Sequence, residues 1–473
     1  MGATAGATGA ATLRAALWCG LLALVVHVGA LANGFAMDDL YNLVANPEIR
    51  VLSNIPGLFG HAWTATAQDG LDHAIGLSYW RPLAALTWTI EYALWGLQPL
   101  GFHAVNLLLH GLVTLLVALL AGRWTDARGA WLAGLLFAVH PVHTEVVCLV
   151  TYRSELLSAS AVTIALGLQF SNRPARLRRQ AALWGLYAVA LLGKESGAVL
   201  PALLATQDWA LRRRLRDQWP LYAGLTAVAL GWLLVRSALV VETPLPYLAA
   251  LPGPVKVWTA LAIQSLHARL WLWPWPLVPF YDWTLCPPAL TPLDPRALLG
   301  VAALAVPAWL AWRWRQRFPL IALGLSWWLL GLLPTSQLLP LPVGAAERFL
   351  YLPSIGACLA LAGGAQALSQ KPLWLAAGRA EKRVVLGVAA AIALLLAGLS
   401  ARRTLDWRDD LTLMQRATLD FPESFNAWHR LGQLHAKAGR WPQAVASFER
   451  ADQVLPGFEP NQRALELARR RER

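Results

Sequence analysis

Long blocks of apolar residues constrain this chain more than any other feature of its sequence. Hydrophobic residues make up 57% of the 473 residues and charged residues only 14%, whereas soluble globular proteins carry roughly 25% charged residues. Many blocks approach the roughly 20 residues with which an α-helix crosses a bilayer. We therefore predict an all-α, polytopic membrane protein with about eleven transmembrane helices. The expected helices lie near residues 12–33, 101–122, 130–149, 155–171, 181–193, 196–210, 219–240, 297–312, 319–338, 350–368 and 384–401.

The charges between these blocks predict how the chain is oriented. Five connections are basic and together carry 17 Lys and Arg residues against three acids, whereas loop 34–80 carries five acids and one base. Because cytoplasmic connections are enriched in Lys and Arg, we expect loop 34–80 to lie outside and the N-terminus inside. Stretch 256–275 is apolar but includes polar side chains, and we predict an interfacial helix there. The positive residues cluster in these connections, so no nucleic-acid partner is expected for the net charge of +13.

The last residues, 402–473, are charged and are predicted to form a second unit after the transmembrane domain, 1–401. Residues 425–458 follow the 34-residue template of a tetratricopeptide repeat, except that His435 stands at a usual aromatic position. With eleven crossings, this segment faces the periplasm or lumen. A single repeat cannot bury its own apolar face, so it must pack against a neighbour, a second chain or a bound segment. The matching positions are Trp428, Leu431, Gly432, Ala444, Phe448, Ala451 and Pro456.

Two adjacent carboxylates, Asp38 and Asp39, follow the first apolar block on the predicted outer side. A carboxylate at a membrane surface can act as a general base, because neighbouring charge and a low dielectric tune its pKa. The alternative is that one of the two caps a helix that begins near Leu40. On spacing alone, the capping role is favoured.

A second polar motif, residues 140–145, lies at the outer end of the third crossing and contains His140, His143 and Glu145. Ionisable groups at the edge of a span are costly and are therefore candidates for function. Two imidazoles and a carboxylate could hold a divalent metal, but we favour a hydrogen-bonded polar cap at a helix end. His103, in the preceding block, adds a further imidazole.

Further charged side chains stand beside the apolar blocks, and the predicted topology places them on the outer side. An Arg can bind a phosphate in bidentate fashion and a Lys as a point charge, although each one alone is explained by an ion pair or by snorkelling to the interface. Gathered together with carboxylates, they suit a lipid-linked phosphate substrate and a polar acceptor. These side chains are Arg81, Arg153, Glu155, Lys194, Glu195, Glu347 and Arg348.

Taken in chain order, these motifs resemble the family of transmembrane proteins with tetratricopeptide repeats that are related to protein O-mannosyltransferases, including bacterial members. The resemblance covers essentially the whole chain. It departs at Met37, where relatives often have Trp, and in having one clear repeat rather than a longer array. The matching pieces are Asp38-Asp39 with Asn46-Pro47, Trp80-Arg81-Pro82-Leu83, Gly101-Phe102-His103 with Asn106 and His110, the motif 140–145, Arg153-Ser154-Glu155-Leu156-Leu157, Gly193-Lys194-Glu195-Ser196, Trp273-Pro274-Trp275-Pro276-Leu277 and Glu347-Arg348-Phe349-Leu350-Tyr351-Leu352-Pro353-Ser354.

This resemblance implies a multi-spanning glycosyltransferase of the GT-C fold. Such an enzyme moves a sugar, here expected to be mannose, with inversion from a polyprenyl-phosphate carrier to a hydroxyl of a protein acceptor. Asp38 or Asp39 would take the proton of that hydroxyl, and no cofactor is assigned. Arg153, Lys194 and Arg348 would stabilise the phosphate leaving group. The remaining expected substrate-binding residues are Arg81, His103, His140, His143, Glu145, Glu155, Glu195 and Glu347.

Two other functions remain open at this point. The sugar could pass to a lipid or polysaccharide acceptor, since an outer-face cavity serves either. Alternatively, the chain could be a non-catalytic assembly factor that recruits partners through its repeat. The abundance of Arg, Ala and Leu fits a bacterial inner membrane, with the repeat in the periplasm.

Overall fold

The computed structural model describes residues 2–65, 77–170, 176–240, 251–338, 341, 343–376 and 378–473. Within these ranges the regular structure is helical, apart from one antiparallel hairpin of β1 (Trp63–Ala65) and β2 (Leu77–Tyr79). The predicted all-α fold is confirmed. Residues 66–76 of the outer loop, which include the acids Asp69 and Asp72, lie outside the described residues.

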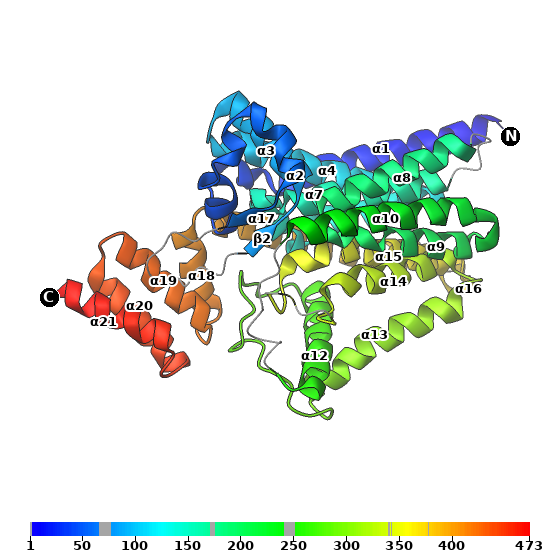
Figure 1. Cartoon of the computed structure of the whole chain (residues 1–473). Helices are drawn as coiled ribbons and strands as arrows, with labels where there is room; N and C mark the ends of the chain where they lie inside the picture. The colour runs from blue at the N-terminus through cyan, green and yellow to red at the C-terminus, as the bar shows by residue number, and fades with distance from the viewer. Residues whose placement is uncertain are drawn as a thin grey trace.

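The first half of the chain builds one side of a helical bundle (Figure 1). The long helix α4 packs against both α1 and α5, and α7 packs against α8. Helix α3, which follows Arg81, lies with α2 and the hairpin at the end of the bundle opposite the N-terminus. The helices are α1 (Gly2–Val26), α2 (Ile55–Gly60), α3 (Pro82–Trp95), α4 (Pro99–Trp124), α5 (Ala127–Val139), α6 (Thr144–Cys148), α7 (Arg153–Gln169), α8 (Arg176–Gly193), α9 (Leu200–Ala210) and α10 (Trp219–Leu239).

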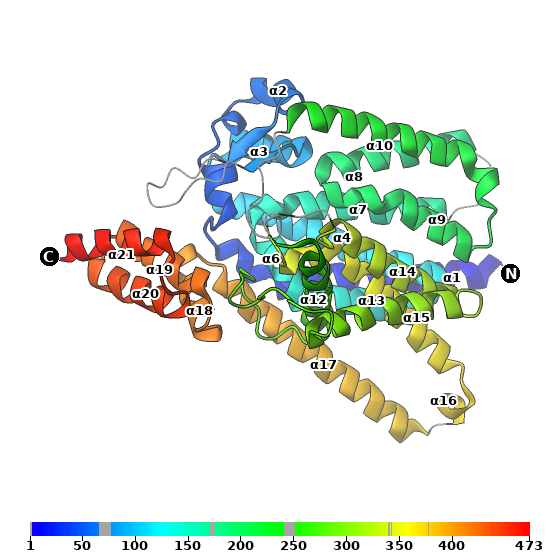
Figure 2. The same ribbon diagram turned by 60° about the horizontal axis from the view of Figure 1, so that its bottom comes forward.

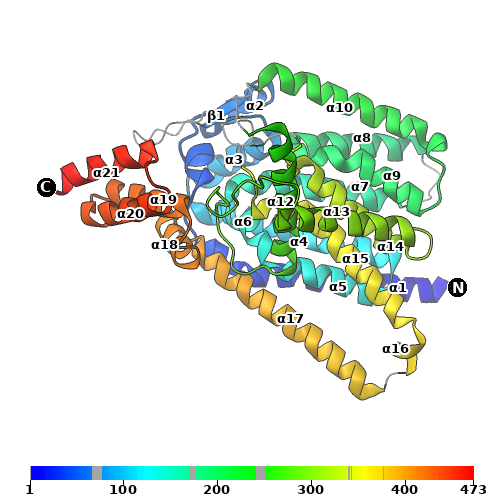
Figure 3. The ribbon, with the colours of Figure 1, turned by 90° about the horizontal axis from the view of Figure 1, so that it is seen from below.

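The second half of the chain adds the remaining helices of the bundle and then the long helix α17, part of which extends away from it. Helix α12 lies crosswise to its neighbours (Figure 1), the arrangement expected of an interfacial helix. The long helix α17 runs obliquely away from the other helices at its N-terminal end, beside α16, and returns to the end that carries the outer loop (Figures 2 and 3). The helices are α12 (Gly253–Leu272), α13 (Pro295–Trp314), α14 (Pro319–Leu332), α15 (Tyr351–Ser369), α16 (Pro372–Ala376) and α17 (Arg379–Asp406).

Every apolar block identified in the sequence coincides with a helix of the bundle. Among the described residues, six helices are long and apolar enough to cross a membrane, and a seventh span arises if α5 and residues 141–148 count as one helix bent by 56°. Several of the other blocks form shorter helices, such as α8 and α9. The chain is thus a multi-pass membrane protein, and eleven crossings stay a prediction.

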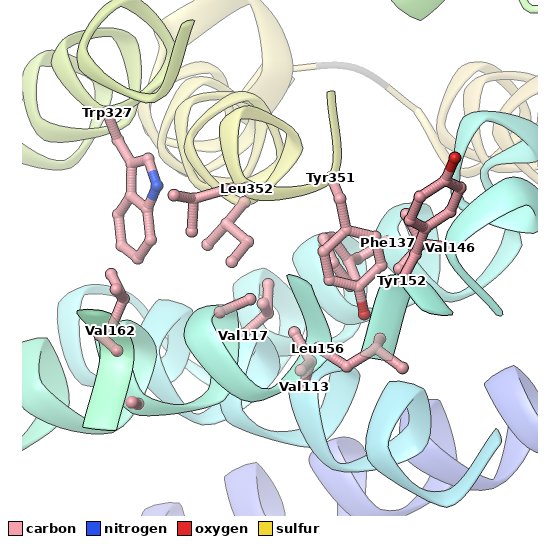
Figure 4. Packing of buried hydrophobic residues seen from close by; sticks show 14 of the residues in the cluster. Val113, Val117, Phe137, Val146, Tyr152, Leu156, Val162, Trp327, Tyr351 and Leu352 are labelled. Atoms are coloured by element: carbon pink, nitrogen blue, oxygen red, sulfur yellow. The ribbon is translucent and has the colours of Figure 1, made fainter. Parts of the chain in front are cut away.

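The bundle is held together by one continuous apolar core to which most of its helices contribute. Figure 4 shows Trp327 and Leu352 from the second half of the chain facing Val117 and Val162 from the first half. Trp327 is fully buried. A bilayer supplies no hydrophobic force between helices, so such contacts stabilise the bundle mainly through close packing.

The chain ends in a group of antiparallel helices beyond the end of the bundle that carries the outer loop (Figure 1). Asp409 and Ser424 cap the first two of these helices by accepting hydrogen bonds from backbone N–H groups. In the predicted repeat, Gly432 lies against the ring of Phe448, where a Cβ would be only 2.6 Å from the ring. The helices are α18 (Asp410–Asp420), α19 (Phe425–Lys437), α20 (Trp441–Val454) and α21 (Glu459–Glu472).

The loop after α12 attaches these terminal helices to the bundle. One oxygen of Asp282 accepts hydrogen bonds from the Asn426 N–H (2.9 Å) and the Ser424 hydroxyl (3.2 Å). Its other oxygen accepts bonds from Thr284 and so holds the shape of the loop. The start of α19 therefore rests on a carboxylate of the transmembrane unit.

The crossing of α14 and α15 provides a test of this packing. A Cβ on Gly356 would lie 2.4 Å from the Gly324 carbonyl oxygen, whereas a Cβ on Gly364 of the same helix would meet nothing within 4 Å. Gly356→Ala should therefore force the helices apart and cost about 1–3 kcal/mol, while Gly364→Ala should be neutral or slightly stabilising. Thermal unfolding midpoints of the two purified variants in detergent measure the difference, and equal midpoints would contradict the crossing.

Candidate active site

The acidic pair lies in the outer loop, and its second carboxylate is fully buried. Asp39 Oδ1 accepts hydrogen bonds from the Thr151 N–H and hydroxyl, both 2.7 Å, and Oδ2 accepts one from the Val150 N–H at 3.0 Å. Burial raises the pKa of this carboxyl to about 7, although these hydrogen bonds lower it. Asp39 thus connects the first outer loop to the turn between α6 and α7.

Asp38, the first carboxylate of the pair, is only partly buried. Its Oδ2 accepts a hydrogen bond of 2.7 Å from the Tyr152 hydroxyl. Within the part of the chain that the structure describes, its Oδ1 accepts no hydrogen bond. Asp38 is therefore more exposed than Asp39, both of whose oxygens accept hydrogen bonds from the turn before α7.

Two arginines reach the same region from opposite parts of the chain. Arg348 is clamped by Glu145, whose carboxylate accepts from its guanidinium and from its backbone N–H (2.6 Å). The guanidinium also lies over the Tyr152 ring, with Cζ 4.6 Å from the ring centroid. Arg81 forms hydrogen bonds of 3.1 and 3.3 Å with Glu195. Each arginine is therefore held in one orientation.

Lys194 and Glu155 form a buried ion pair next to these arginines. Ser196 donates a further hydrogen bond of 3.0 Å to the same carboxylate. Burial lowers the pKa of the Lys194 ammonium, Glu155 opposes that effect, and the positive charges of Arg81 and Arg348 lower the pKa further. The three cations are thus close enough to influence one another, as the predicted convergence requires.

Tyr79, at the end of the small hairpin, lies among these groups. Burial raises the pKa of its hydroxyl, the carboxylates of Asp38 and Glu195 add to the increase, and Arg81 and Arg348 oppose it. The Arg81 guanidinium lies 5.1 Å from the centre of the Tyr79 ring. The predicted site residues from the outer loop, the α8–α9 hairpin and the start of α15 therefore share one electrostatic environment.

Arg153 does not face this environment, although the sequence predicted that it stabilises a phosphate. Its side chain is fully buried and forms an ion pair with Glu91 of α3. It also donates hydrogen bonds to Asn106 Oδ1 and to the Phe102 carbonyl, both 2.8 Å. With its donors used by α3 and α4, Arg153 holds these helices together. The geometry does not support substrate binding by this residue.

His103 lies on the same side as Arg153 and supports the outer loop. Its Nε2 is 3.2 Å from the Gly34 carbonyl oxygen. His103 is fully buried. It contacts the chain four residues before Asp38, so it shapes the loop rather than the cluster of charges.

The residues His140, His143 and Glu145 do not converge on one point. Pro141 interrupts the helix after α5, because a residue before proline is driven from helical conformation. His140 Nε2 bonds the Trp271 carbonyl (2.9 Å) and its ring stacks on Trp271, whereas His143 Nδ1 bonds a carbonyl of α5. Among the described residues, no group of three or more His, Cys, Asp or Glu side chains could hold a metal ion.

Glu347, the remaining predicted residue, is buried behind Arg348. Its carboxylate accepts hydrogen bonds from Tyr281 (3.3 Å) and Arg403 (3.2 Å). Sequence reasoning missed Arg403 because it stands at the polar end of a predicted span. It also missed Tyr152, which directly precedes Arg153, and Tyr79, which stands two residues before Arg81.

An apolar cavity of about 730 Å³ lies between α12, α13, α14 and α15. Its walls include Leu272, Val306 and Leu361, with Arg269 and Arg296 also in the lining. Trp271 lines the cavity and stacks on His140. Trp271 therefore connects this apolar cavity to the polar motif 140–145, which contains Glu145.

These features define a polytopic membrane protein with a cluster of paired charges beside its outer loop, and its sequence has known relatives. It is 28% identical to the human protein O-mannosyl-transferase TMTC4 over 91% of this chain and 65% of that protein. It is 27% identical to mouse TMTC3 over 89% of this chain and 49% of that protein. With Drosophila melanogaster Tmtc1 it shares 36% identity over 189 residues. No family model matches the sequence.

The chain is therefore similar in sequence to the protein O-mannosyl-transferases, which supports the family resemblance predicted from its motifs. It spans about half to two thirds of the length of these curated relatives. Among solved structures it is similar to ArnT from Cupriavidus metallidurans bound to undecaprenyl phosphate. That similarity has a TM-score of 0.41 and 18% identity, over 96% of this chain and 77% of the other.

The different environments of the two acids lead to a test of stability. Asp39→Ala removes the acceptor of three buried hydrogen bonds and should cost about 2–4 kcal/mol. Asp38→Ala removes one hydrogen bond at a partly exposed site and should cost about 1 kcal/mol or less. Unfolding midpoints in detergent measure both changes. Equal losses in the two variants would show that the acids do not differ in this way.

Proposed function

We propose that the chain is an inverting membrane glycosyltransferase that moves mannose from a polyprenyl-phosphate carrier to a hydroxyl of a protein acceptor. The observation that carries the proposal is that Tyr152 joins a partly exposed carboxylate to a cation: its hydroxyl donates to Asp38, and the Arg348 guanidinium lies over its ring. The relatives are named protein O-mannosyl-transferases, and these names support mannose as the sugar and a protein as the acceptor. We place the site on the periplasmic face of a bacterial inner membrane, with a cytoplasmic N-terminus.

Asp38 is the proposed general base. In the reaction, the acceptor oxygen forms a bond to the anomeric carbon while the bond from that carbon to the phosphate oxygen breaks. The hydroxyl proton passes to Asp38, and polyprenyl phosphate leaves with the bonding electrons. Asp39 is the poorer candidate for this role, because two N–H groups and a hydroxyl already donate to it.

Arg348 is the proposed principal contact to the phosphate. Glu145 engages Nη1 and the backbone N–H of Arg348, so the remaining guanidinium nitrogens can still donate to an oxyanion. Lys194 and Arg81 add positive charge nearby and are held by Glu155 and Glu195. Preorganised donors of this kind stabilise charge as it develops on a leaving group.

The apolar cavity between α12 and α15 supports the use of a lipid-linked donor. Its lining is dominated by aliphatic and aromatic side chains, and it is connected through Trp271 to the motif that holds Arg348. The isoprenoid tail of the donor could therefore lie at this cavity, while its phosphate lies at the end of the cavity near the motif that holds Arg348. His140 and His143 would contribute to the wall of the donor site without a metal ion.

The test uses the purified full chain in liposomes with radiolabelled polyprenyl-phosphate mannose and a periplasmic protein fraction. Asp38→Asn should lower transfer roughly 10²–10⁴-fold, the range for loss of a general base. Glu423→Gln is the matched control, an exposed acid near α19 that should transfer label at the native rate. The readouts are labelled protein and released polyprenyl phosphate.

Each outcome of this test is informative. Label that reaches lipid or polysaccharide instead of protein would assign a different acceptor. Equal transfer by native chain and Asp38→Asn would contradict the proposed base. If the native chain transferred no label from any polyprenyl-phosphate sugar while damage to the repeat abolished its cellular role, the assembly-factor function would replace the enzyme.

A further inference from the structure

The segment that leads to the acidic pair lies along the junction between α17 and the terminal helices. The Asn33 side chain donates to the Thr404 carbonyl at 3.1 Å, and the Gly34 N–H donates to the Arg408 carbonyl at 2.9 Å. The last residue of the first apolar block and the first residue of the outer loop are thus bonded to the end of α17 and to the turn after it. These partners are separated by more than 370 residues of sequence.

A third contact between this segment and the terminal helices involves Met37, a residue in an unusual backbone conformation. Met37 has a φ of +52°, in the left-handed region that a non-glycine residue seldom adopts. Its backbone N–H donates a hydrogen bond of 2.6 Å to Asp410 Oδ1, at the first residue of α18. A residue in this region persists only where its surroundings hold it. Here the turn bonds from the Asp39 N–H to the Ala36 carbonyl (3.0 Å) and from the Leu40 N–H to the Met37 carbonyl (3.1 Å) act together with Asp410.

The contact lies next to the proposed base. Met37 immediately precedes Asp38, whose carboxylate is bonded on its other side by Tyr152. Met37 and, from α18, Leu413 and Met414 belong to the same apolar core cluster. The Asp410 bond places the start of helix α18 against the backbone that precedes Asp38.

Asp410 is not needed to cap its own helix. Asp409 performs that role by accepting a hydrogen bond of 2.8 Å from the Thr412 N–H. The neighbouring acids therefore have separate partners, one within α18 and one in the outer loop. Asp409 provides a matched control, since its removal deletes an acid and a helix cap but leaves the contact to Met37.

We propose that Asp410 is a positioning residue for Asp38: it holds Met37 in the left-handed conformation and so directs the carboxylate toward the acceptor. The inference rests on the proposed function, in that Asp38 must act on a substrate. It assigns to the terminal helices a part in building the site, in addition to any binding by the repeat.

The experiment compares Asp410→Ala, Asp410→Asn and Asp409→Ala in the full chain reconstituted in nanodiscs. Hydrogen exchange of residues 33–42, read by mass spectrometry without substrate, reports the contact itself. Asp410→Ala should speed exchange in this segment about fivefold, the effect of losing one hydrogen bond. Asp410→Asn keeps an acceptor oxygen and should resemble the native chain, as should Asp409→Ala.

Turnover with polyprenyl-phosphate mannose is the second readout. Asp410→Ala should lower kcat by about 10- to 100-fold with little change in the KM for the carrier, because the base is misdirected. Asp410→Asn should restore kcat. If the native chain shows no turnover, the proposed function fails, whereas the exchange measurement still decides whether Asp410 holds the segment.

A second pair of variants separates positioning from general damage. In the Asp410→Ala background, Met37→Gly and Met37→Ala both remove the side chain, but only glycine adopts a positive φ without a steric penalty. Met37→Gly should recover part of the lost kcat and Met37→Ala should not. The inference is overturned if Asp410→Ala matches Asp409→Ala in exchange and turnover, or if both Met37 variants behave alike.

Discussion

The arrangement of the candidate site depends on the buried carboxylate of Asp39. By accepting hydrogen bonds from Val150 and Thr151, it fixes the first outer loop to the turn that leads into α7. A buried carboxylate without such donors would be costly, so the loop and the turn must adopt their conformations together. The same turn places Tyr152 against Asp38. Two adjacent acids thereby acquire different roles, one structural and one facing the cluster of cations.

Buried charges with fixed partners also join segments elsewhere in the bundle, in the form of ion pairs. Arg153 with Glu91 joins α7 to α3, and Lys194 with Glu155 joins the α8–α9 hairpin to α7. Breaking a buried pair leaves one charge uncompensated and is strongly destabilising. The helices must therefore assemble in one arrangement before the cations of the site, such as Arg348, can lie near one another. Pairing also fixes the orientation of these side chains, which a site that stabilises a developing charge requires.

Much of the fold could be predicted from the sequence, because apolar blocks and the spacing of the repeat are local signals. The repeat, the acidic pair and most of the charged motifs were also recognisable. The division of roles between Asp38 and Asp39 was not, since it depends on donors more than a hundred residues away. Arg153 was predicted to bind a phosphate because nothing in its local sequence shows that Glu91 lies opposite. Asp410 carried no signal at all, being an ordinary acid at the start of a helix.

The contacts of the terminal helices change how the repeat should be understood. These helices are attached at two points, through Asp410 at the outer loop and through Asp282 at the start of α19. The first point adjoins Asp38, and the second belongs to the loop after α12, the helix that lines the apolar cavity. A segment bound along α19 and α20 would thus act on a unit that contacts both the proposed base and the proposed lipid site. The terminal helices are therefore better described as attached to the outer loop and to the loop after α12 than as a module carried beside the bundle.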